Sequence, residues 1–277
     1  EEANIQLANI LHEAGAHVVY GVVGYKTHAK LTLVVRREKN HVRRYVHLGT
    51  GNYHAGTARA YTDIGLMSHD KVLGEDVHKI FQQLTGLGKT VKLKKVLQAP
   101  FTMHKSMLQK IRRETEHARN GHKAHIMARM NSLIEPQVIR ALYEASQAGV
   151  KIELLVRGIC ALRPGIPGVS ENIHVRSVMG RFLEHTRAVY FLNNGEPELF
   201  AGSADWMPRN FFRRVETAFP IEDPALRDRV VKETLSYYFA DNTNAWVLKK
   251  DGSYARVNRG STQPRTTHSR LLEELSS

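Results

Sequence analysis

Apolar positions spaced three and four residues apart predict a helix at the start of the chain. Its apolar face consists of Leu7, Ile10, Leu11 and Ala14. Gly15 ends this helix, because glycine readily adopts the left-handed conformation found after helix C-termini. A nearly continuous apolar run over residues 17–23 then predicts a buried strand.

The same pattern of helix and strand returns in the second half of the chain. A second helix face consists of Ile139, Leu142, Tyr143 and Ser146, with Gly149 at its end and a strand predicted over residues 151–156. Another strand, predicted over residues 124–130, precedes this helix. Its counterpart in the first copy would lie before residue 1. We therefore expect an internal duplication whose first copy is truncated at its N-terminus.

Each copy continues into a strand predicted to begin with a histidine, followed by a turn of small residues. His28 and His185 begin the two strands, and Gly49 and Gly202 begin the two turns. The histidines are 157 positions apart and the glycines 153, so two independent landmarks give nearly the same offset. These repeated features predict an α/β fold of two tandem domains, with one active site between them.

A basic segment and a proline separate the two copies. Residues 87–95 are basic, Pro100 interrupts the pattern, and residues 103–119 have the periodicity of a helix. We place the boundary near residue 96, which gives domains at residues 1–95 and 96–277. After Ser253 the chain is polar and rich in Arg, Thr and Ser, which predicts a surface tail.

Composition narrows the class of protein and its partners. The chain has 277 residues, 42% of them apolar, and no apolar run approaches the roughly 20 residues that span a bilayer. Its formal charge of +13 favours a polyanionic partner, which could be nucleic acid, nucleotide, polyphosphate or an anionic membrane. The single cysteine, Cys160, cannot form an intrachain disulfide, which favours a reducing cytosol.

In both copies the histidine is followed two positions later by a cation. The pairs are His28 with Lys30 and His185 with Arg187. Side chains alternate along a strand, so each pair should point to the same face. A neutral imidazole can attack phosphorus while the cation stabilises charge on the phosphate oxygens. The small-residue turns should add backbone N–H groups and hydroxyls around the same phosphate.

A carboxylate follows the turn in each copy. Asp63 lies 35 positions after the first histidine and Glu216 lies 31 after the second. A nucleophilic imidazole needs an acceptor for its other N–H, so we expect at least one of these carboxylates within roughly 2.6–3.2 Å of a catalytic histidine. The alternative is an ordinary surface ion pair with a nearby arginine, Arg59 or Arg214.

The duplicated His-x-Lys motif with a small-residue turn resembles the phospholipase D superfamily. In that superfamily two halves build one active site, in which one histidine is the nucleophile and the other an acid or base. The Asp that usually lies five positions after the lysine is Val35 here and Leu192 in the second copy, and the second cation is Arg187. These departures argue against a phospholipase or a nuclease.

The sequence more closely resembles the polyphosphate kinase family that is built on phospholipase D-like domains. The matching segments are residues 26–31, 47–53, 57–63, 155–160, 182–187 and 203–210. The resemblance covers about residues 1–250. It implies the two C-terminal catalytic domains of a longer enzyme that reversibly transfers the terminal phosphate of ATP to polyphosphate. On this interpretation the 277 residues alone should be nearly inactive.

The resemblance assigns roles to individual residues. It implies that His28 becomes phosphorylated, that His185 is the second histidine, at the nucleotide, and that Tyr61 contacts the adenine. Arg157 and Arg214 are implied to contact phosphates. The family also uses Mg²⁺, but its metal-associated arginines would precede residue 1, and we predict no metal ligand in this chain. ATP, ADP and polyphosphate are the implied partners of a cytoplasmic homo-oligomer that could associate with an anionic membrane, and we expect no nucleic acid.

Three alternatives remain from the residues themselves. A zinc site would need better ligand spacing than the histidine groups offer, namely His41, His47 and His54, or His117, His122 and His125. A phospholipase D-type nuclease or lipid phosphotransferase would use the same histidine chemistry on a diester. A non-catalytic nucleic-acid-binding module would use the basic surface but would leave the duplicated histidines unexplained.

Overall fold

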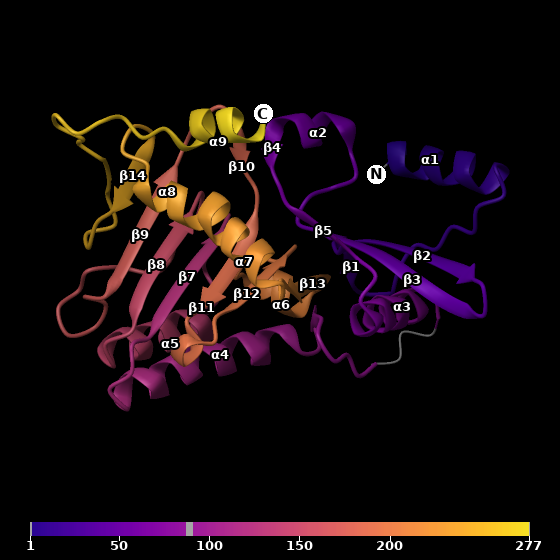
Figure 1. The fold of residues 1–277 in the computed structure, drawn as a ribbon, viewed down its shortest axis with the longest axis horizontal. Coiled ribbons are helices and arrows are strands. Elements are labelled where there is room, and N and C mark those ends of the chain that lie inside the picture. The colour runs from indigo at the N-terminus through magenta and orange to yellow at the C-terminus, as the bar shows by residue number, and fades with distance from the viewer. Residues whose placement is uncertain (1, 87–90, 277) are drawn as a thin grey trace.

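The computed structural model describes residues 2–86 and 91–276, and a large mixed sheet lies at its centre (Figure 1). The strand order is β1-β13-β12-β11-β7-β8-β9-β14-β15, and β6 pairs with β13. The strands are β1 (Lys26–Thr27), β6 (Leu97–Ala99), β7 (His125–Met130), β8 (Lys151–Val156), β9 (Ile173–Val178), β11 (Arg187–Phe191), β12 (Glu198–Gly202), β13 (Arg214–Pro220), β14 (Ala245–Leu248) and β15 (Tyr254–Arg256).

Helices cover both faces of this sheet (Figure 1). On β7, Ile126 and Ala128 pack into a core with α4 and α5, while Met127 joins a second core on the other face. This division follows from strand alternation, and burial on both faces explains why β7 is apolar nearly throughout. The helical elements of this half are α4 (Met103–Arg119), α5 (Pro136–Gln147), a 3₁₀ turn η1 (Asn193–Gly195), α6 (Pro208–Phe212), α7 (Pro224–Val231), a π-helical turn η2 (Lys232–Ser236), α8 (Tyr237–Ala240) and α9 (Thr267–Leu275).

A smaller antiparallel sheet forms the first half, with strand order β2-β3-β5. Helix α3 packs on it through Leu73 and Val77, and begins where the Asp70 carboxylate accepts a hydrogen bond from the Leu73 N–H at 2.8 Å. The elements are α1 (Glu2–Glu13), β2 (Lys30–Glu38), β3 (His41–Gly49), α2 (Ala55–Ala60), β4 (Tyr61–Thr62), β5 (Gly65–Ser68) and α3 (Lys71–Thr85). The apolar residues between α3 and this sheet belong to the same core as Met127 of β7, so the two halves share apolar packing.

Two short parallel ladders join the halves at the predicted site. Strand β1 of the first half pairs with β13 of the second, with Thr27 opposite Val215. In the reverse sense, β10 (Leu183–Glu184) of the second half pairs with β4 of the first. Each half thus lends the strand before its histidine to the other half. The predicted α/β fold with a site between two duplicated units is confirmed.

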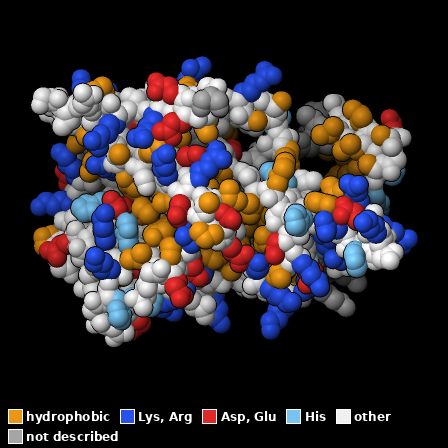
Figure 2. Space-filling model, in the orientation of Figure 1, with side chains coloured by type: hydrophobic (Ala, Val, Ile, Leu, Met, Phe, Trp, Pro, Cys, Tyr) orange, Lys and Arg blue, Asp and Glu red, His pale blue; other side chains and the backbone are white. Residues whose placement is uncertain are grey.

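The helices and strands predicted around residues 103–156 are confirmed as α4, β7, α5 and β8, whereas the strand predicted over residues 17–23 is wrong. Tyr20 and Val23 are 80% and 98% exposed, and no described strand pairs with this segment. The equivalent strand β8 is hydrogen-bonded on both sides, by β7 and β9. Residues 17–23 have no described neighbouring strand to accept or donate backbone hydrogen bonds, so most of their N–H and C=O groups must bond to water and no strand forms. The apolar face of α1 is also exposed (Figure 2).

The predicted surface tail after Ser253 is wrong in part, because it contains β15 and α9. His268 on α9 is only 5% exposed and packs beside the second histidine's strand. The two histidine strands also begin later than predicted, at Lys30 and Arg187. The predicted basic segment falls partly on residues 87–90, which lie outside the described residues. Within the described chain, no helix has the length and apolar character needed to cross a bilayer.

Candidate active site

His28 lies at the junction of β1 and β2, where the first half meets β13. Its backbone N–H donates to the Val215 carbonyl at 2.9 Å, which fixes the chain at this point. Its ring Nδ1 lies 2.8 Å from Oε2 of Glu216, a carboxylate that is fully buried. The histidine of the first half is therefore held by a carboxylate of the second.

His185 has the reciprocal arrangement at the junction of β10 and β11. Its backbone N–H donates to Thr62 Oγ1 at 3.1 Å, and its Nδ1 lies 2.8 Å from Oδ1 of Asp63. The predicted contact between a carboxylate and a histidine is confirmed at both histidines. Both contacts run between the halves, a point that the sequence left open.

These contacts determine which ring nitrogen is free. A carboxylate can only accept hydrogen bonds, so each Nδ1 must be the donor. In the neutral imidazole the lone pair then lies on Nε2. The His28 and His185 side chains remain 22% and 13% exposed, so both rings are partly accessible to solvent. Glu216 is fully buried, whereas the Asp63 side chain is itself 24% exposed. Each ring is therefore oriented with its basic nitrogen available for chemistry.

The hydroxyls of the small-residue turns hold the two carboxylates. Thr50 Oγ1 donates to Asp63 Oδ1 at 2.6 Å, and Ser203 Oγ donates to Glu216 Oε2. Asn210 Nδ2 also donates to Glu216, at 2.6 Å to Oε1. The expectation that these hydroxyls surround the phosphate is corrected, because they point to the carboxylates instead.

The cations that follow the histidines are buried beneath them. Lys30 is 5% exposed and donates to the His28 carbonyl oxygen, and Arg187 is 7% exposed and donates to the His185 carbonyl at 2.7 Å. Burial lowers the pKa of Lys30 to about 8. The charges of Asp63, Glu216 and Arg187 all act on the Lys30 ammonium, which places the two half-sites in one electrostatic environment.

Tyr61 lies beside the second histidine rather than in a core. Its ring centroid is 5.1 Å from that of His185, with the planes inclined at 51°. Tyr61 and Asp63 also line a cavity of about 420 Å³ that extends to Phe182 and His268. Pockets of a few hundred Å³ with an aromatic wall suit a small planar ligand. The predicted adenine contact therefore has space beside it.

The two arginines implied to contact phosphates reach the site by different routes. Arg157, at the end of β8, donates from Nε to Asn131 Oδ1 at 2.9 Å. The Asn131 N–H donates to Asp205 at 2.7 Å, and Asp205 also binds the guanidinium of Arg187. Arg214 begins β13, with Nη1 4.0 Å from Glu216 Oε1. Arg214 therefore adjoins the carboxylate that holds His28, whereas Arg157 is linked to His185 only indirectly, through Asn131, Asp205 and Arg187.

A buried polar network behind His185 was not predicted. Glu184 accepts from Arg129 and pairs with His268 on α9, and all three side chains are buried. Arg129 also donates to Thr62 Oγ1 at 2.8 Å, which is the atom that accepts the His185 N–H. An arginine within the apolar strand over residues 124–130 was the available signal, because a buried guanidinium needs a partner.

The described residues do not offer a metal site. No group of three or more His, Cys, Asp or Glu side chains among residues 2–86 and 91–276 is placed to hold an ion. Glu216 and Asp63, which contact His28 and His185, are committed to hydrogen bonds with them. Mg²⁺ therefore does not fit these residues as ligands.

Comparisons with known proteins agree with this geometry. Residues 1–90 match the family model for polyphosphate kinase C-terminal domain 1, and residues 96–268 match that for C-terminal domain 2. The chain is 60% identical over 276 residues to the polyphosphate kinase of Pseudomonas aeruginosa, covering 99% of this chain and 40% of that protein. It is 58% identical over 277 residues to that of Pseudomonas putida, covering 100% of this chain and 38% of that protein.

A solved structure shows the same fold. The crystal structure of polyphosphate kinase from Porphyromonas gingivalis superposes with a TM-score of 0.92 at 33% identity, over 99% of this chain and 42% of that one. The chain thus spans about two fifths of the length of these relatives. Both family models and the fold agree, and the chain belongs to the polyphosphate kinase family.

Proposed function

We propose that this chain forms the catalytic part of a polyphosphate kinase, which transfers the terminal phosphate of ATP reversibly to polyphosphate through a phosphohistidine at His28. The observation that carries the proposal is the pair of histidines, each held at Nδ1 by a carboxylate of the opposite half. A single contact of this kind could simply hold a histidine in place. The same contact at two equivalent histidines, with the lone pair on Nε2 in both neutral rings, supports paired chemical roles.

The transfer proceeds in two displacements at phosphorus. The Nε2 lone pair of His28 forms a bond to the terminal phosphorus of ATP, and the bond to the bridging oxygen breaks, so that ADP leaves with the electron pair. A terminal oxygen of polyphosphate then attacks the same phosphorus, and the N–P bond breaks to restore the imidazole. Glu216 stabilises the positive charge that the His28 ring acquires in the first step. The Lys30 ammonium, which donates to the His28 carbonyl oxygen, adds positive charge that stabilises the oxygens of the transferred phosphate.

The second half-site serves the nucleotide. His185, with Asp63 to stabilise its protonated form, carries a proton at Nε2 to and from the bridging oxygen of the leaving ADP. Tyr61, 5.1 Å from that ring, stacks on the adenine. Arg157 and Arg214 bind the phosphates, since a guanidinium offers paired donors to phosphate oxygens.

The remaining features of the proposal concern the whole enzyme. The 277 residues are incomplete for activity and act within a longer cytoplasmic homo-oligomer that could associate with an anionic membrane. Mg²⁺, if bound by residues outside this chain, would supply positive charge to the nucleotide phosphates. The partners are ATP, ADP and polyphosphate, without nucleic acid. On the face drawn in Figure 2, Lys and Arg are spread over both halves and form no single stripe, an arrangement that does not favour a nucleic-acid duplex there.

A labelling experiment tests this function. The full-length protein is incubated with ATP labelled with ³²P at the terminal phosphate, and label on the protein is followed in base and in acid. We expect label that is stable in base and lost in acid, as for a phosphoramidate, and none in His28→Ala. Wild-type labelling of His28→Ala, or the absence of any ATP-dependent label, would refute the proposal and favour a phosphodiesterase or a binding module.

A further inference from the structure

A second cavity lies at the far end of β12 and β13, the strands that hold His28. Its volume is about 570 Å³, and it is lined by the start of β12 and the end of β13. The opposite ends of these strands carry Ser203 and Glu216, which hold His28. Glu216 and Pro220 are four residues apart on β13, about 13 Å at the rise of a strand. The cavity is thus separate from the site described above.

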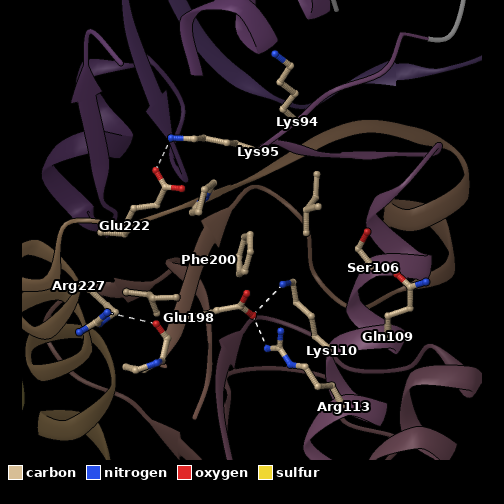
Figure 3. Close-up of a pocket in the computed structure, with 15 residues that line it drawn as sticks. Lys94, Lys95, Ser106, Gln109, Lys110, Arg113, Glu198, Phe200, Glu222 and Arg227 are labelled. Carbon is tan, nitrogen blue, oxygen red and sulfur yellow. Dashed lines mark hydrogen bonds and ion pairs between the residues drawn. The ribbon is translucent and has the colours of Figure 1, made fainter. Parts of the chain in front are cut away.

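Positive charge gathers in this cavity from three parts of the chain. Lys94 and Lys95 precede β6, Lys110 and Arg113 lie on α4, and Arg227 lies on α7. Among the described lining residues these cations outnumber the carboxylates by five to two. Figure 3 shows Lys95 on one side of Phe200, and Lys110 and Arg113 on the other. Two separated groups of cations suit a ligand with several charges along its length.

Some of these cations are withdrawn from solvent, although the Lys94 side chain is 62% exposed. The side chains of Lys110 and Arg227 are only 16% and 17% exposed, so solvent screens their charges less. The backbone N–H groups of Lys94 and Lys95 both donate to the buried carboxylate of Asp76, at 3.0 and 2.7 Å. That carboxylate fixes the segment before β6 against α3. The positions of the cations are therefore built into the fold.

Carboxylates pair with all five cations, but they are shared unevenly. Lys110 and Arg113 both donate to the same oxygen of Glu198, so one negative charge faces two positive ones. Lys95, on the other side of the cavity, is bound by two carboxylates, Glu222 at 2.6 Å and Asp70 at 3.2 Å (Figure 3). An incoming anion therefore meets excess positive charge around Glu198.

The floor between the two groups of cations is apolar. Phe200 lies in it, with the Lys110 ammonium 4.5 Å from the ring centroid, and Leu97, Leu199 and Ile221 also line the cavity. An apolar floor under a charged rim binds organic groups as well as phosphates. The volume lies within the range of about 300–1,000 Å³ that is usual for small-molecule sites.

We propose that this cavity is a second binding site for a phosphate chain, distinct from the site of His28 and His185. The chain spans from Lys95 to Lys110 and Arg113 across Phe200. It can belong to a nucleotide, whose base would lie on the apolar floor, or to inorganic polyphosphate. The proposal does not depend on phosphoryl transfer, so its failure would leave the proposed function intact.

Binding in a catalytically silent background tests the site. The full-length protein carrying His28→Ala is titrated calorimetrically with ADP and, separately, with inorganic triphosphate. Hydrogen exchange locates the protected segments. We expect protection of residues 103–113 and 197–202 in addition to the catalytic site. Protection by ADP alone identifies a nucleotide, protection by triphosphate alone an inorganic chain, and protection by both the shared phosphate chain.

Matched variants assign the binding to the cavity. The double change Lys110→Gln and Arg113→Gln should weaken binding at this site at least tenfold, and Lys95→Gln should weaken it from the opposite side. Glu198→Gln should strengthen it severalfold, because it removes a competing charge. Lys105→Gln, an exposed change on the same helix, is the control. Absence of protection, or affinities within twofold of the control in every variant, would overturn the proposal.

Discussion

The carboxylate that holds His28 can be neutralised with little change of shape. Glu216→Gln keeps an oxygen that can accept from His28 Nδ1 and from Ser203, and puts an amide N–H in place of Oε1. Asn210 donates to Oε1, while its own Oδ1 is buried without a partner among the described residues. A half-turn of the Asn210 amide would satisfy the new donor. We therefore expect this variant to fold.

The size of the effect follows from the loss of charge. A hydrogen bond to a charged group contributes about 1.5–3 kcal/mol and a neutral one about 0.5–1.5 kcal/mol, so the His28 contact weakens by about 1–1.5 kcal/mol. That difference corresponds to a phosphorylation roughly five- to tenfold slower. The loss is larger if the glutamine amide turns its nitrogen to His28, because the ring then takes the wrong tautomer. About fivefold is thus a lower bound.

Rapid-quench measurement of phosphohistidine formation in the full-length enzyme provides the assay. The rate constant should fall at least about fivefold while the ATP affinity stays near that of the wild type, because Glu216 acts on His28 and not on the nucleotide. Asp63→Asn serves as the companion, since it neutralises the carboxylate of His185 instead. Phosphorylation of Glu216→Gln within twofold of the wild type would refute an orienting role for this carboxylate.

Three further predictions concern groups around the two histidines. Burial lowers the pKa of Lys30 to about 8, so its charge and the transfer rate should fall as the pH rises through about 8. Lys30→Arg should remove this alkaline limb, and an unchanged pH profile would contradict the prediction. Ser203→Ala should lower the free energy of unfolding by about 1–2 kcal/mol and slow phosphorylation severalfold, with rescue by Ser203→Thr; equal rates in the two variants would contradict this. His268→Ala leaves Glu184 short of a buried partner and should lower the free energy of unfolding by about 2–4 kcal/mol in urea denaturation, whereas the exposed control His174→Ala should match the wild type.

The sequence predicted the members of the site because the duplication repeated them in order. Neither His28 nor His185 is distinctive alone, but each lies before a cation and a small-residue turn. Asp63 and Glu216 are 153 positions apart, the same offset as Gly49 and Gly202. Each carboxylate therefore lies the same number of residues after the glycine of its turn, so the two carboxylates occupy equivalent positions in the two copies. The contacts of these side chains could therefore be predicted, although not the half from which each carboxylate comes.

Features that depend on distant partners could not be predicted. The apolar run over residues 17–23 has the composition of a strand but has no neighbouring strand among the described residues. The polar composition after Ser253 predicted a surface tail, but His268 in that segment is buried against Glu184, which lies 84 positions away in the sequence. The roles of Thr50 and Ser203 were missed for the same reason, since a hydroxyl in a turn does not reveal which acceptor lies beside it.

The exchange of strands between the halves makes the site a property of the whole chain. The His28 N–H and ring are both bound by β13 of the second half, and the His185 N–H and ring by residues of β4 and its following turn in the first. Removal of either half would take from the other histidine both its backbone anchor and its carboxylate. Duplication alone would have given two separate half-sites. Reciprocal pairing turns the two copies into one site, in which neither histidine is oriented until both halves have folded together.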